Sequence, residues 1–261
     1  MNIGIIGFGK MGEAITKGLL KEKVYKVYYY EKEEKRVEQV SAKYAQIEYL
    51  NLASLIEQSE TILLAVKPQE IKDLLAAIDA LLKTDKLFIS ICAGISTPFI
   101  QSYLTKARII RAMPNMGALV GKSFTVVTKG ESAVKKDLDI ARDIFAAVGD
   151  VKEISEDLMD SVTAVSGSGP AYFAYFLKAL GEAASEIGLS DISDKIAMDT
   201  CIATMSILRD MGLSYDELIE KVASPGGTTE ACLDFWNQNG FSELVKQGIK
   251  KARRRAKELG R

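Results

Sequence analysis

The feature that most restricts the fold is a glycine-rich turn between a strand-like run and a helical pattern. Residues 2–6 form a short β-branched apolar run, and the G-x-G-x-x-G motif follows at once, before apolar residues recur at helical spacing. In this context the glycines allow a tight turn, close approach of a pyrophosphate and close packing of helix on strand. An ordinary strand-to-helix turn is the plainer alternative. We predict a dinucleotide-binding turn made of Gly7, Phe8, Gly9, Lys10, Met11 and Gly12.

Further apolar, strand-like runs alternate with helical segments through the first half of the chain. They lie at 27–30, 61–66, 87–92, 108–112 and 125–127, and a helix is predicted over 68–82. Continuous apolar strands alternating with helices are typical of a parallel sheet covered on both faces. We therefore predict an α/β fold whose N-terminal domain, residues 1–155, is a Rossmann-type doubly wound parallel sheet. Ligands of such sheets bind at the carboxyl ends of the strands.

Glu31 ends the second predicted strand and bears on the choice of cofactor. It follows Gly12 by nineteen residues, close to the spacing of about 20 typical of the acid that binds the ribose. A carboxylate there favours NAD over NADP because it repels a 2′-phosphate. Lys32, Lys35 and Arg36 follow directly and could offset this repulsion, although each is equally well explained as part of an exposed charge cluster. Both NADPH and NADH stay open as the cofactor.

The second half of the chain has a helical pattern and predicts a C-terminal all-α dimerisation domain over 156–261. Pro170 suits the first turn of a helix whose early turns are apolar nearly all round. A helix of this kind is buried on every side, and a domain of about 100 residues achieves that most easily against a second copy. We predict a homodimer built on this helix and on a second helix at 194–211. A self-contained monomeric bundle is the alternative.

A second glycine-rich turn lies near the C-terminus and precedes a helical pattern that begins near Glu230. A helix N-terminus of this kind presents free N–H groups that attract a carboxylate or phosphate. Helix capping is the alternative for the hydroxyls, and at Thr229 it would contribute about 1 kcal/mol of stability. We predict that this turn holds a small anionic substrate through Ser224, Gly226, Gly227, Thr228 and Thr229.

Composition excludes several classes of function. The net charge of −1 gives no sign of a nucleic-acid or acidic-membrane partner, and the longest uncharged stretch, 17 residues at 161–177, is too short and too broken to cross a membrane. No histidine is present, which excludes Ser-His triads and His-ligated zinc, and no metal is expected. Three scattered cysteines indicate reduced thiols, and residue 1 leads straight into a strand without a signal peptide. We expect a cytoplasmic protein.

Five motifs occur in an order that resembles the pyrroline-5-carboxylate reductase family over the whole length of the chain. After the N-terminal motif come Ala65-Val66-Lys67-Pro68-Gln69, Arg111-Ala112-Met113-Pro114-Asn115, the segment from Thr163 to Tyr172, and Ser224 to Thr229. The last two are highly specific, whereas the first two are shared with related dehydrogenases. The resemblance implies reduction of the cyclic imine 1-pyrroline-5-carboxylate to L-proline by NAD(P)H, the last step of proline biosynthesis. It also implies dimers that often assemble into rings of five.

The resemblance also implies roles for individual residues. Ser224, Gly227 and Thr228 would bind the substrate carboxylate, and Thr229 would be the catalytic residue whose hydroxyl faces the imine nitrogen. Because an imine nitrogen is basic enough to take a proton from water, the reaction mainly needs proximity and orientation. The adenosine and ribose side of the cofactor would be lined by Ala65, Val66, Lys67 and Pro68, and the nicotinamide would be bordered by Cys92 and Ala93.

Three alternatives to this activity stay open. A β-hydroxyacid dehydrogenase would carry a lysine on the long helix with an asparagine four residues later, but Glu182 follows Lys178 at that spacing and suits an exposed ion pair. Another cyclic-imine reductase would need only a different substrate. A non-catalytic NAD(P)-binding protein is the remaining alternative, and the intact Gly-Gly-Thr-Thr turn argues against it.

Overall fold

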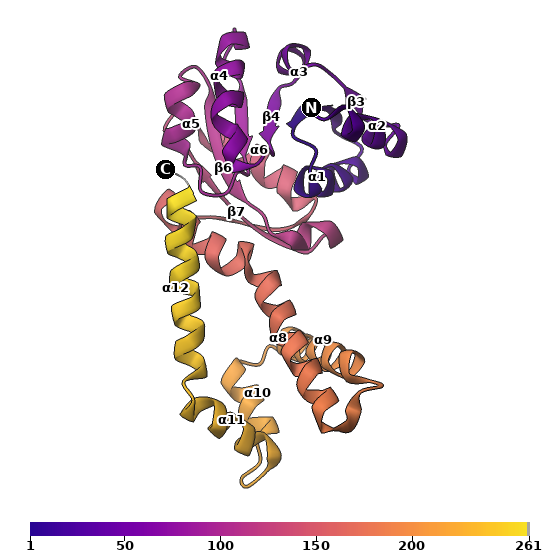
Figure 1. Cartoon of the computed structure of the whole chain (residues 1–261). Coiled ribbons are helices and arrows are strands. Elements are labelled where there is room, and N and C mark those ends of the chain that lie inside the picture. The colour runs from indigo at the N-terminus through magenta and orange to yellow at the C-terminus, as the bar shows by residue number, and fades with distance from the viewer. Residues whose placement is uncertain (260–261) are drawn as a thin grey trace. The chain divides into compact units, whose positions relative to one another are not determined.

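A computed structural model describes residues 1–259 as two compact units. The first comprises Met1–Ser168 together with the C-terminal segment from Ala252, and the second comprises Gly169–Lys251. The first unit contains the sheet, and the second is made of helices (Figure 1).

Strands and helices alternate along the first unit, as the apolar runs predict. Its elements are β1 (Asn2–Ile6), α1 (Lys10–Lys21), β2 (Lys26–Tyr30), α2 (Glu34–Lys43), β3 (Glu48–Tyr49), α3 (Leu52–Gln58), β4 (Thr61–Leu64), η1 (Pro68–Glu70), α4 (Ile71–Leu81), β5 (Leu87–Ser90), α5 (Thr97–Tyr103), β6 (Arg108–Met113), η2 (Met116–Val120), β7 (Ser123–Lys129), α6 (Lys135–Ala146), β8 (Gly149–Glu153), η3 (Glu156–Leu158), α7 (Met159–Val162) and η4 (Thr163–Gly167). Here η1, η2 and η3 are short 3₁₀ helices, and η4 is a π-helical segment.

The eight strands form one sheet in the order β3-β2-β1-β4-β5-β6-β7-β8. The first six are mutually parallel, with β2 and β4 on either side of β1, which confirms the doubly wound α/β prediction. The sheet is mostly rather than wholly parallel. Strand β7 is antiparallel to β6, and β8 is parallel to β7, so these two strands run opposite to the other six. Only 114–122 connect β6 to β7, too few residues for the crossover that a parallel pair requires.

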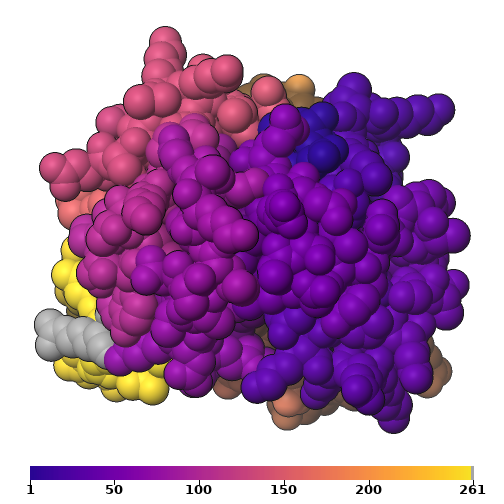
Figure 2. Space-filling view, turned by 90° about the horizontal axis from the view of Figure 1, so that it is seen from above, coloured from indigo at the N-terminus to yellow at the C-terminus, as the bar shows by residue number. Residues whose placement is uncertain are grey.

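Two apolar layers enclose the sheet. Alternate strand residues such as Ile5 and Tyr29 pack with α1, α2 and α6 on one face, and residues such as Ile62 and Phe88 pack with α3, α4 and α5 on the other. Side chains of successive strand residues point to opposite faces, so continuous apolar strands supply both layers. Residues of the first half of the chain form most of the face seen in Figure 2.

A buried ion-pair network fixes the segment that follows the sheet. Arg111 on β6 is 3% exposed, and its guanidinium contacts Glu156 Oε1 at 2.6 Å and Asp160 Oδ1 at 3.3 Å. The hydroxyl of Thr97 donates to Glu156 Oε2 over 3.0 Å. The network therefore attaches η3 and α7 to the centre of the sheet.

The second unit buries very little of its own apolar surface. Its elements are α8 (Gly169–Ala184), the π-helical η5 (Ser185–Leu189), α9 (Ser193–Met211), α10 (Tyr215–Val222), α11 (Thr228–Gln238) and most of α12 (Phe241–Leu259). Between Gly169 and Lys251, the buried apolar side chains are only Ala184 and Ala197. Phe173 and Tyr175 on α8 are 62% and 74% exposed, so one chain alone does not give α8 the burial that its sequence predicts.

Two further findings concern the described residues 1–259. None of their helices has the length and apolar character needed to cross a membrane. No group of three or more His, Cys, Asp or Glu side chains among them is placed to hold a metal ion.

Candidate functional site

Each of the three glycines in the turn after β1 has a different local environment, which shows why a side chain is absent at that position. Gly7 has a φ of +90°, and an added Cβ would lie 2.8 Å from the carbonyl oxygen of Ala65. At Gly12 an added Cβ would lie 2.6 Å from Gly7 O, so this glycine allows α1 to pack closely on the turn. At Gly9, within the part of the chain that the structure describes, an added Cβ would meet no atom within 4 Å. Gly9 therefore borders open space.

The open space beside Gly9 fits the phosphates of a dinucleotide. Gly9 precedes α1, and no side chain among the described residues caps that helix N-terminus. Lys10 and Met11 are the first two helical residues, and their N–H groups have no partner one turn earlier within the helix. Uncapped N–H groups and the positive end of the helix dipole attract a phosphate. The side chain of Phe8 points away from this space and is fully buried in the core.

Charged side chains bind the backbone of Phe8 at both its N–H and its carbonyl. Its N–H donates to Glu31 Oε2 over 2.9 Å, and its carbonyl accepts from Arg36 Nε over 3.0 Å. Glu31 Oε1 also accepts from the backbone N–H of Lys32 over 2.7 Å. The acid predicted to bind the ribose thus also braces the glycine turn after β1, a contact that its spacing from Gly12 does not reveal.

Glu13 in the first turn of α1 gathers three donors from α2 and its end. Its carboxylate accepts from Arg36 Nη2 over 2.8 Å, from Lys43 Nζ over 2.7 Å and from the Tyr44 hydroxyl over 2.7 Å. Burial raises the pKa of Glu13, but the hydrogen bonds from Lys43, Tyr44 and Arg36 outweigh it and lower that pKa from 4.5 to about 2. Glu13 therefore stays ionised and ties α2 to α1.

Acid sensitivity is one consequence of this depressed pKa. The Glu13 carboxylate stabilises the folded chain above pH 4.5, and the contribution is lost as the pH falls through about 2. For Glu13→Gln we expect a lower free energy of unfolding than for the unchanged chain near neutral pH, with the difference shrinking between pH 4.5 and pH 2. Urea denaturation over this pH range measures it, and a difference that does not change with pH would contradict this role.

The loops after β4 and β5 lie at the same edge of the sheet as the glycine turn, because β1, β4 and β5 are adjacent and parallel. Ala65 N–H donates to Ile6 O over 2.8 Å, Val66 is half-buried, and Lys67 is exposed just before Pro68 begins η1. The structure thus brings together the predicted residues of the three loops, including the half-buried Ala93.

Cys92 acts as a structural tie and not as a nucleophile. Its side chain is buried at 3% exposure, and its thiol donates to the carbonyl of Val66 over 3.3 Å. Burial raises the pKa of the Cys92 thiol from 9.0 to about 11, so the thiol stays protonated near neutral pH. Cys92 joins the end of β5 to the end of β4, which is a suitable role for a residue at the border of a cofactor site.

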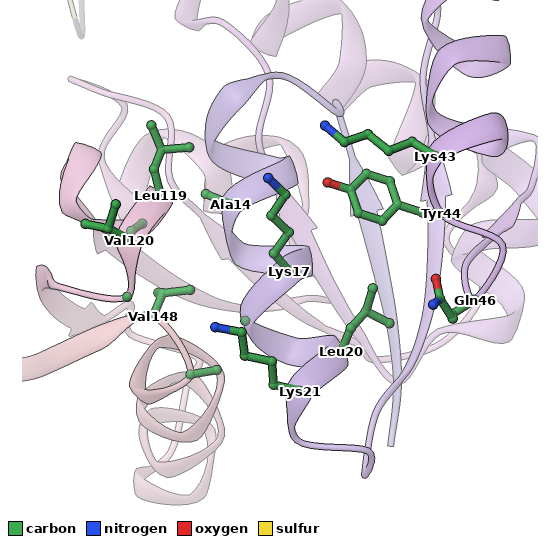
Figure 3. Close-up of a pocket in the computed structure, with 14 residues that line it drawn as sticks. Ala14, Lys17, Leu20, Lys21, Lys43, Tyr44, Gln46, Leu119, Val120 and Val148 are labelled. Carbon is green, nitrogen blue, oxygen red and sulfur yellow. The ribbon is translucent and has the colours of Figure 1, made fainter.

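Surface cavities of the first unit include one away from the predicted site residues and one that Pro68 borders. One of about 450 Å³ opens among α1, the end of α2 and η2, and Figure 3 shows Lys17, Lys21 and Lys43 around it. None of the sequence-predicted site residues lines it. The other, of about 310 Å³, includes Pro68 together with α4, α5 and the end of α12.

The second predicted turn, in the helical unit, is a tight turn that leads into α11. Gly227 N–H donates to Ser224 O over 2.9 Å, and Gly226 has a φ of +71°, as a type II turn with glycine at its third position requires. At Gly227 an added Cβ would lie 2.6 Å from Ser224 Oγ. Glycine is therefore needed at both positions for the turn itself.

Helix α11 begins at Thr228, two residues earlier than the sequence pattern indicates. Gly227 is the cap residue, and no side chain among the described residues caps the helix. Thr229 is the second helical residue and is half-buried, while Thr228 is exposed. Glu230 Oε2 accepts from Gly226 N–H over 2.7 Å, which stiffens the turn. The helix N-terminus remains open to an anion.

Asn115 and Ser166 form a contact to which sequence reasoning assigned no role. Asn115 follows β6 at the same edge of the sheet, and its Nδ2 donates to Ser166 Oγ in η4 over 3.0 Å. An added Cβ at Gly167 would lie 2.8 Å from Met113 Cε, so η4 packs closely against the end of β6. Asn115 and Ser166 each lie in a motif noted in the sequence, but the sequence does not show that the two motifs contact each other.

Lys178 and Glu182 form an exposed ion pair of 3.5 Å on α8, with 70% and 62% of their side chains exposed. This contact agrees with the exposed ion pair that their spacing in the sequence suggests. It provides no support for the lysine–asparagine arrangement of the β-hydroxyacid dehydrogenases.

Comparison with known proteins covers both parts of the chain. Residues 156–259 match the family model described as "Pyrroline-5-carboxylate reductase dimerisation", which implies a homodimer. Residues 2–94 match the model described as "NADP oxidoreductase coenzyme F420-dependent". A 3-hydroxyisobutyrate dehydrogenase from Mycobacterium tuberculosis, 14% identical with a TM-score of 0.53, shares the fold alone over 74% of this chain and 67% of its own.

Relatives that match over the full length of the chain are described as pyrroline-5-carboxylate reductases. The pyrroline-5-carboxylate reductase of Synechocystis sp. is 37% identical over 100% of this chain and 99% of its own length, and that of Methanosarcina acetivorans is 31% identical over 99% and 98%. The crystal structure of the Plasmodium falciparum pyrroline carboxylate reductase with NADP bound is 28% identical, with a TM-score of 0.88 over 100% of this chain and 98% of that chain. With full-length identity of this extent and a matching dimerisation region, the chain belongs to the pyrroline-5-carboxylate reductase family.

Proposed function

We propose that the chain reduces 1-pyrroline-5-carboxylate to L-proline with NADPH or NADH. The observation that carries the proposal is the uncapped N-terminus of α11, where Thr229 stands beside a rigid turn. The open space at Gly9 supports the cofactor part, and the relatives described as pyrroline-5-carboxylate reductases support the substrate. NADP bound to the Plasmodium falciparum relative supports a nicotinamide dinucleotide.

Each half of the reaction has its own residues. The bound nicotinamide supplies the hydride. The N–H groups at the start of α1 bind the pyrophosphate, and Glu31 accepts from a ribose hydroxyl. The N–H groups of Thr228 and Thr229, with Ser224 beside them, bind the substrate carboxylate. Thr229 donates its hydroxyl proton in a hydrogen bond to the imine nitrogen, which orients the ring and relays a proton taken from water.

Binding through backbone N–H groups explains why no histidine is needed. The carboxylate is fixed by the helix N-terminus, and the imine nitrogen is basic, so the protein supplies orientation rather than a strong acid. The glycines at 226 and 227 hold the turn, and Ala65, Val66, Lys67, Pro68, Cys92 and Ala93 provide the remaining wall of the cofactor site.

The proposal is tested by following NADH and NADPH oxidation with the five-membered imine carboxylate. We expect oxidation that depends on both the imine and the protein. A panel of six-membered imines and keto acids then distinguishes this activity from another cyclic-imine reductase or a hydroxyacid dehydrogenase. Cofactor binding without any oxidation would favour the non-catalytic alternative.

For Thr229→Ala we expect turnover of the imine to fall at least about tenfold while the fold is kept. The second helical position is not the cap, so loss of its hydroxyl removes no capping bond and costs little stability. Steady-state kinetics and thermal unfolding separate the two effects, with Thr229→Ser as the matched control, because it keeps the hydroxyl and should keep most of the turnover. Unchanged turnover in Thr229→Ala would leave this threonine without a role in the reaction.

Organisation and location complete the proposal. We propose a domain boundary near residue 155, supported by the start of the matched dimerisation region at 156, although the compact units divide between Ser168 and Gly169. We also infer that the homodimers assemble into a ring. Exposed apolar residues of α12 such as Leu244 and Val245 support contacts beyond one chain, and sedimentation of the intact protein measures the mass of the assembly. A cytoplasmic location is supported by three cysteines that form no disulfide among residues 1–259.

A further inference from the structure

Arg36 binds the backbone of the same residue as the proposed ribose-binding acid, Glu31, and its guanidinium already has partners within the fold. Its Nε donates to Phe8 O, the carbonyl of the same residue whose N–H binds Glu31. Its Nη2 donates to Glu13 Oε2 over 2.8 Å, and its Nη1 reaches Gln39 Oε1 over 3.4 Å. In dinucleotide folds an arginine near the ribose-binding acid accommodates the 2′-phosphate of NADP. All three nitrogen atoms of this guanidinium have other partners.

Glu31 presents a carboxylate that suits a hydroxyl and repels a phosphate. Its two oxygens accept N–H groups from Phe8, Lys32 and Glu33, which fix the group at the end of β2. Each carboxylate oxygen has two acceptor positions, and because Oε1 already accepts two N–H groups and Oε2 one, a ribose hydroxyl can still donate to Oε2. A 2′-phosphate carries negative charge at neutral pH and would need a cation nearby to offset Glu31.

Glu13 is the residue that keeps Arg36 occupied. Besides Arg36, its carboxylate binds Lys43 and Tyr44, and Figure 3 shows both side chains reaching from the end of α2 toward α1. If the Glu13 side chain moved together with the guanidinium of Arg36, it would lose its hydrogen bonds to Lys43 and Tyr44. A phosphate that drew on Nη2 of Arg36 would compete with its charge-assisted bond to Glu13.

We propose that Glu13, by occupying Arg36, makes this chain prefer NADH to NADPH. The inference rests on the proposed dinucleotide site. Lys32 and Lys35 are exposed neighbours, but an ammonium is a point charge without the fork geometry that binds a phosphate through two parallel bonds. Glu31 thus lacks the guanidinium that would offset its charge, and Glu13 becomes a positioning residue for cofactor selectivity.

Direct titration of the full-length protein with NADH and with NADPH, without any imine, tests the proposal. We expect the Kd for NADPH to exceed that for NADH by about tenfold or more, which is about 1.4 kcal/mol. In Glu13→Gln the freed guanidinium should lower the Kd for NADPH about fivefold and leave that for NADH within about twofold. Calorimetry with 2′,5′-ADP against 5′-AMP should repeat the change on the phosphate alone.

Two further variants separate selectivity from stability. Lys43→Met also removes a partner of Glu13 but leaves Arg36 bound, so the ratio of the two Kd values should not change. Glu13→Gln combined with Arg36→Met should lose the gain in NADPH affinity. A preference for NADPH in the unchanged chain, or an unchanged ratio in Glu13→Gln, would overturn this inference alone. Failure to bind either dinucleotide would overturn the proposed site as well.

Discussion

Replacement of Gly9 by valine is expected to weaken binding of NADH and NADPH at least about a hundredfold, while the chain stays folded. An added Cβ at this position meets no protein atom within 4 Å in the described residues, so the folded chain has room for the side chain. The valine would instead fill the space proposed for the pyrophosphate. Fluorescence titration with the reduced dinucleotide measures the affinity, and circular dichroism reports on the fold.

Gly12→Val is the matched control for this experiment. Its Cβ would lie 2.6 Å from the carbonyl oxygen of Gly7, a backbone atom that cannot move aside easily, so this variant should lose about 2 kcal/mol of stability or more. Within one motif, Gly9 thus tests the space proposed for the ligand, and Gly12 tests the packing of the helix on the turn. Retention of normal dinucleotide affinity by a folded Gly9→Val chain would show that the phosphates bind elsewhere.

The second large effect is expected at Arg111, whose replacement by methionine should lower the free energy of unfolding by about 3 kcal/mol. The guanidinium is 3% exposed, and its removal leaves Glu156 and Asp160 partly buried without their cation. The penalty comes from these uncompensated charges rather than from a lost gain in Coulomb energy. Urea denaturation at one fixed protein concentration measures it.

Arg142→Met provides the comparison on the surface of the same unit. Arg142 pairs with Glu153 and Asp139, but its side chain is 41% exposed and those of the partners are 45% and 54% exposed, so the loss should stay below about 1 kcal/mol. Equal losses for the two variants would mean that the Arg111 network does not anchor the segment after the sheet.

The parts of the fold that depend on local pattern could be predicted from the sequence. The strand at residues 2–6 and the helix after Gly9 follow from an apolar run, a glycine turn and helical spacing, all within about 20 residues. In contrast, β3 consists of two exposed residues, Glu48 and Tyr49, and carries no apolar pattern. The reversal at β7 depends on how a short connection leaves β6, which strand composition does not encode.

In the candidate site too, motifs of consecutive residues could be predicted from the sequence, whereas contacts between residues far apart in the chain could not. The glycine turns and their residues could be identified because their chemistry lies in consecutive positions. The pairing of Arg36 with Glu13 spans 23 residues, and that of Arg111 with Glu156 spans 45, so each depends on the register of strands and helices that sequence spacing cannot supply. A charged residue that seems free in the sequence, such as Arg36, can therefore be bound in the fold by residues far from it in the chain.

The sparse core of the helical unit makes protein concentration a variable of its stability. A region whose only buried apolar side chains are two alanines cannot offset its conformational entropy by itself, so much of its folding free energy must come from the second copy. Ordering of α8 and α9 is then a bimolecular event. Dilution should lower the temperature at which these helices melt, whereas the sheet, with its own two apolar layers, should respond far less.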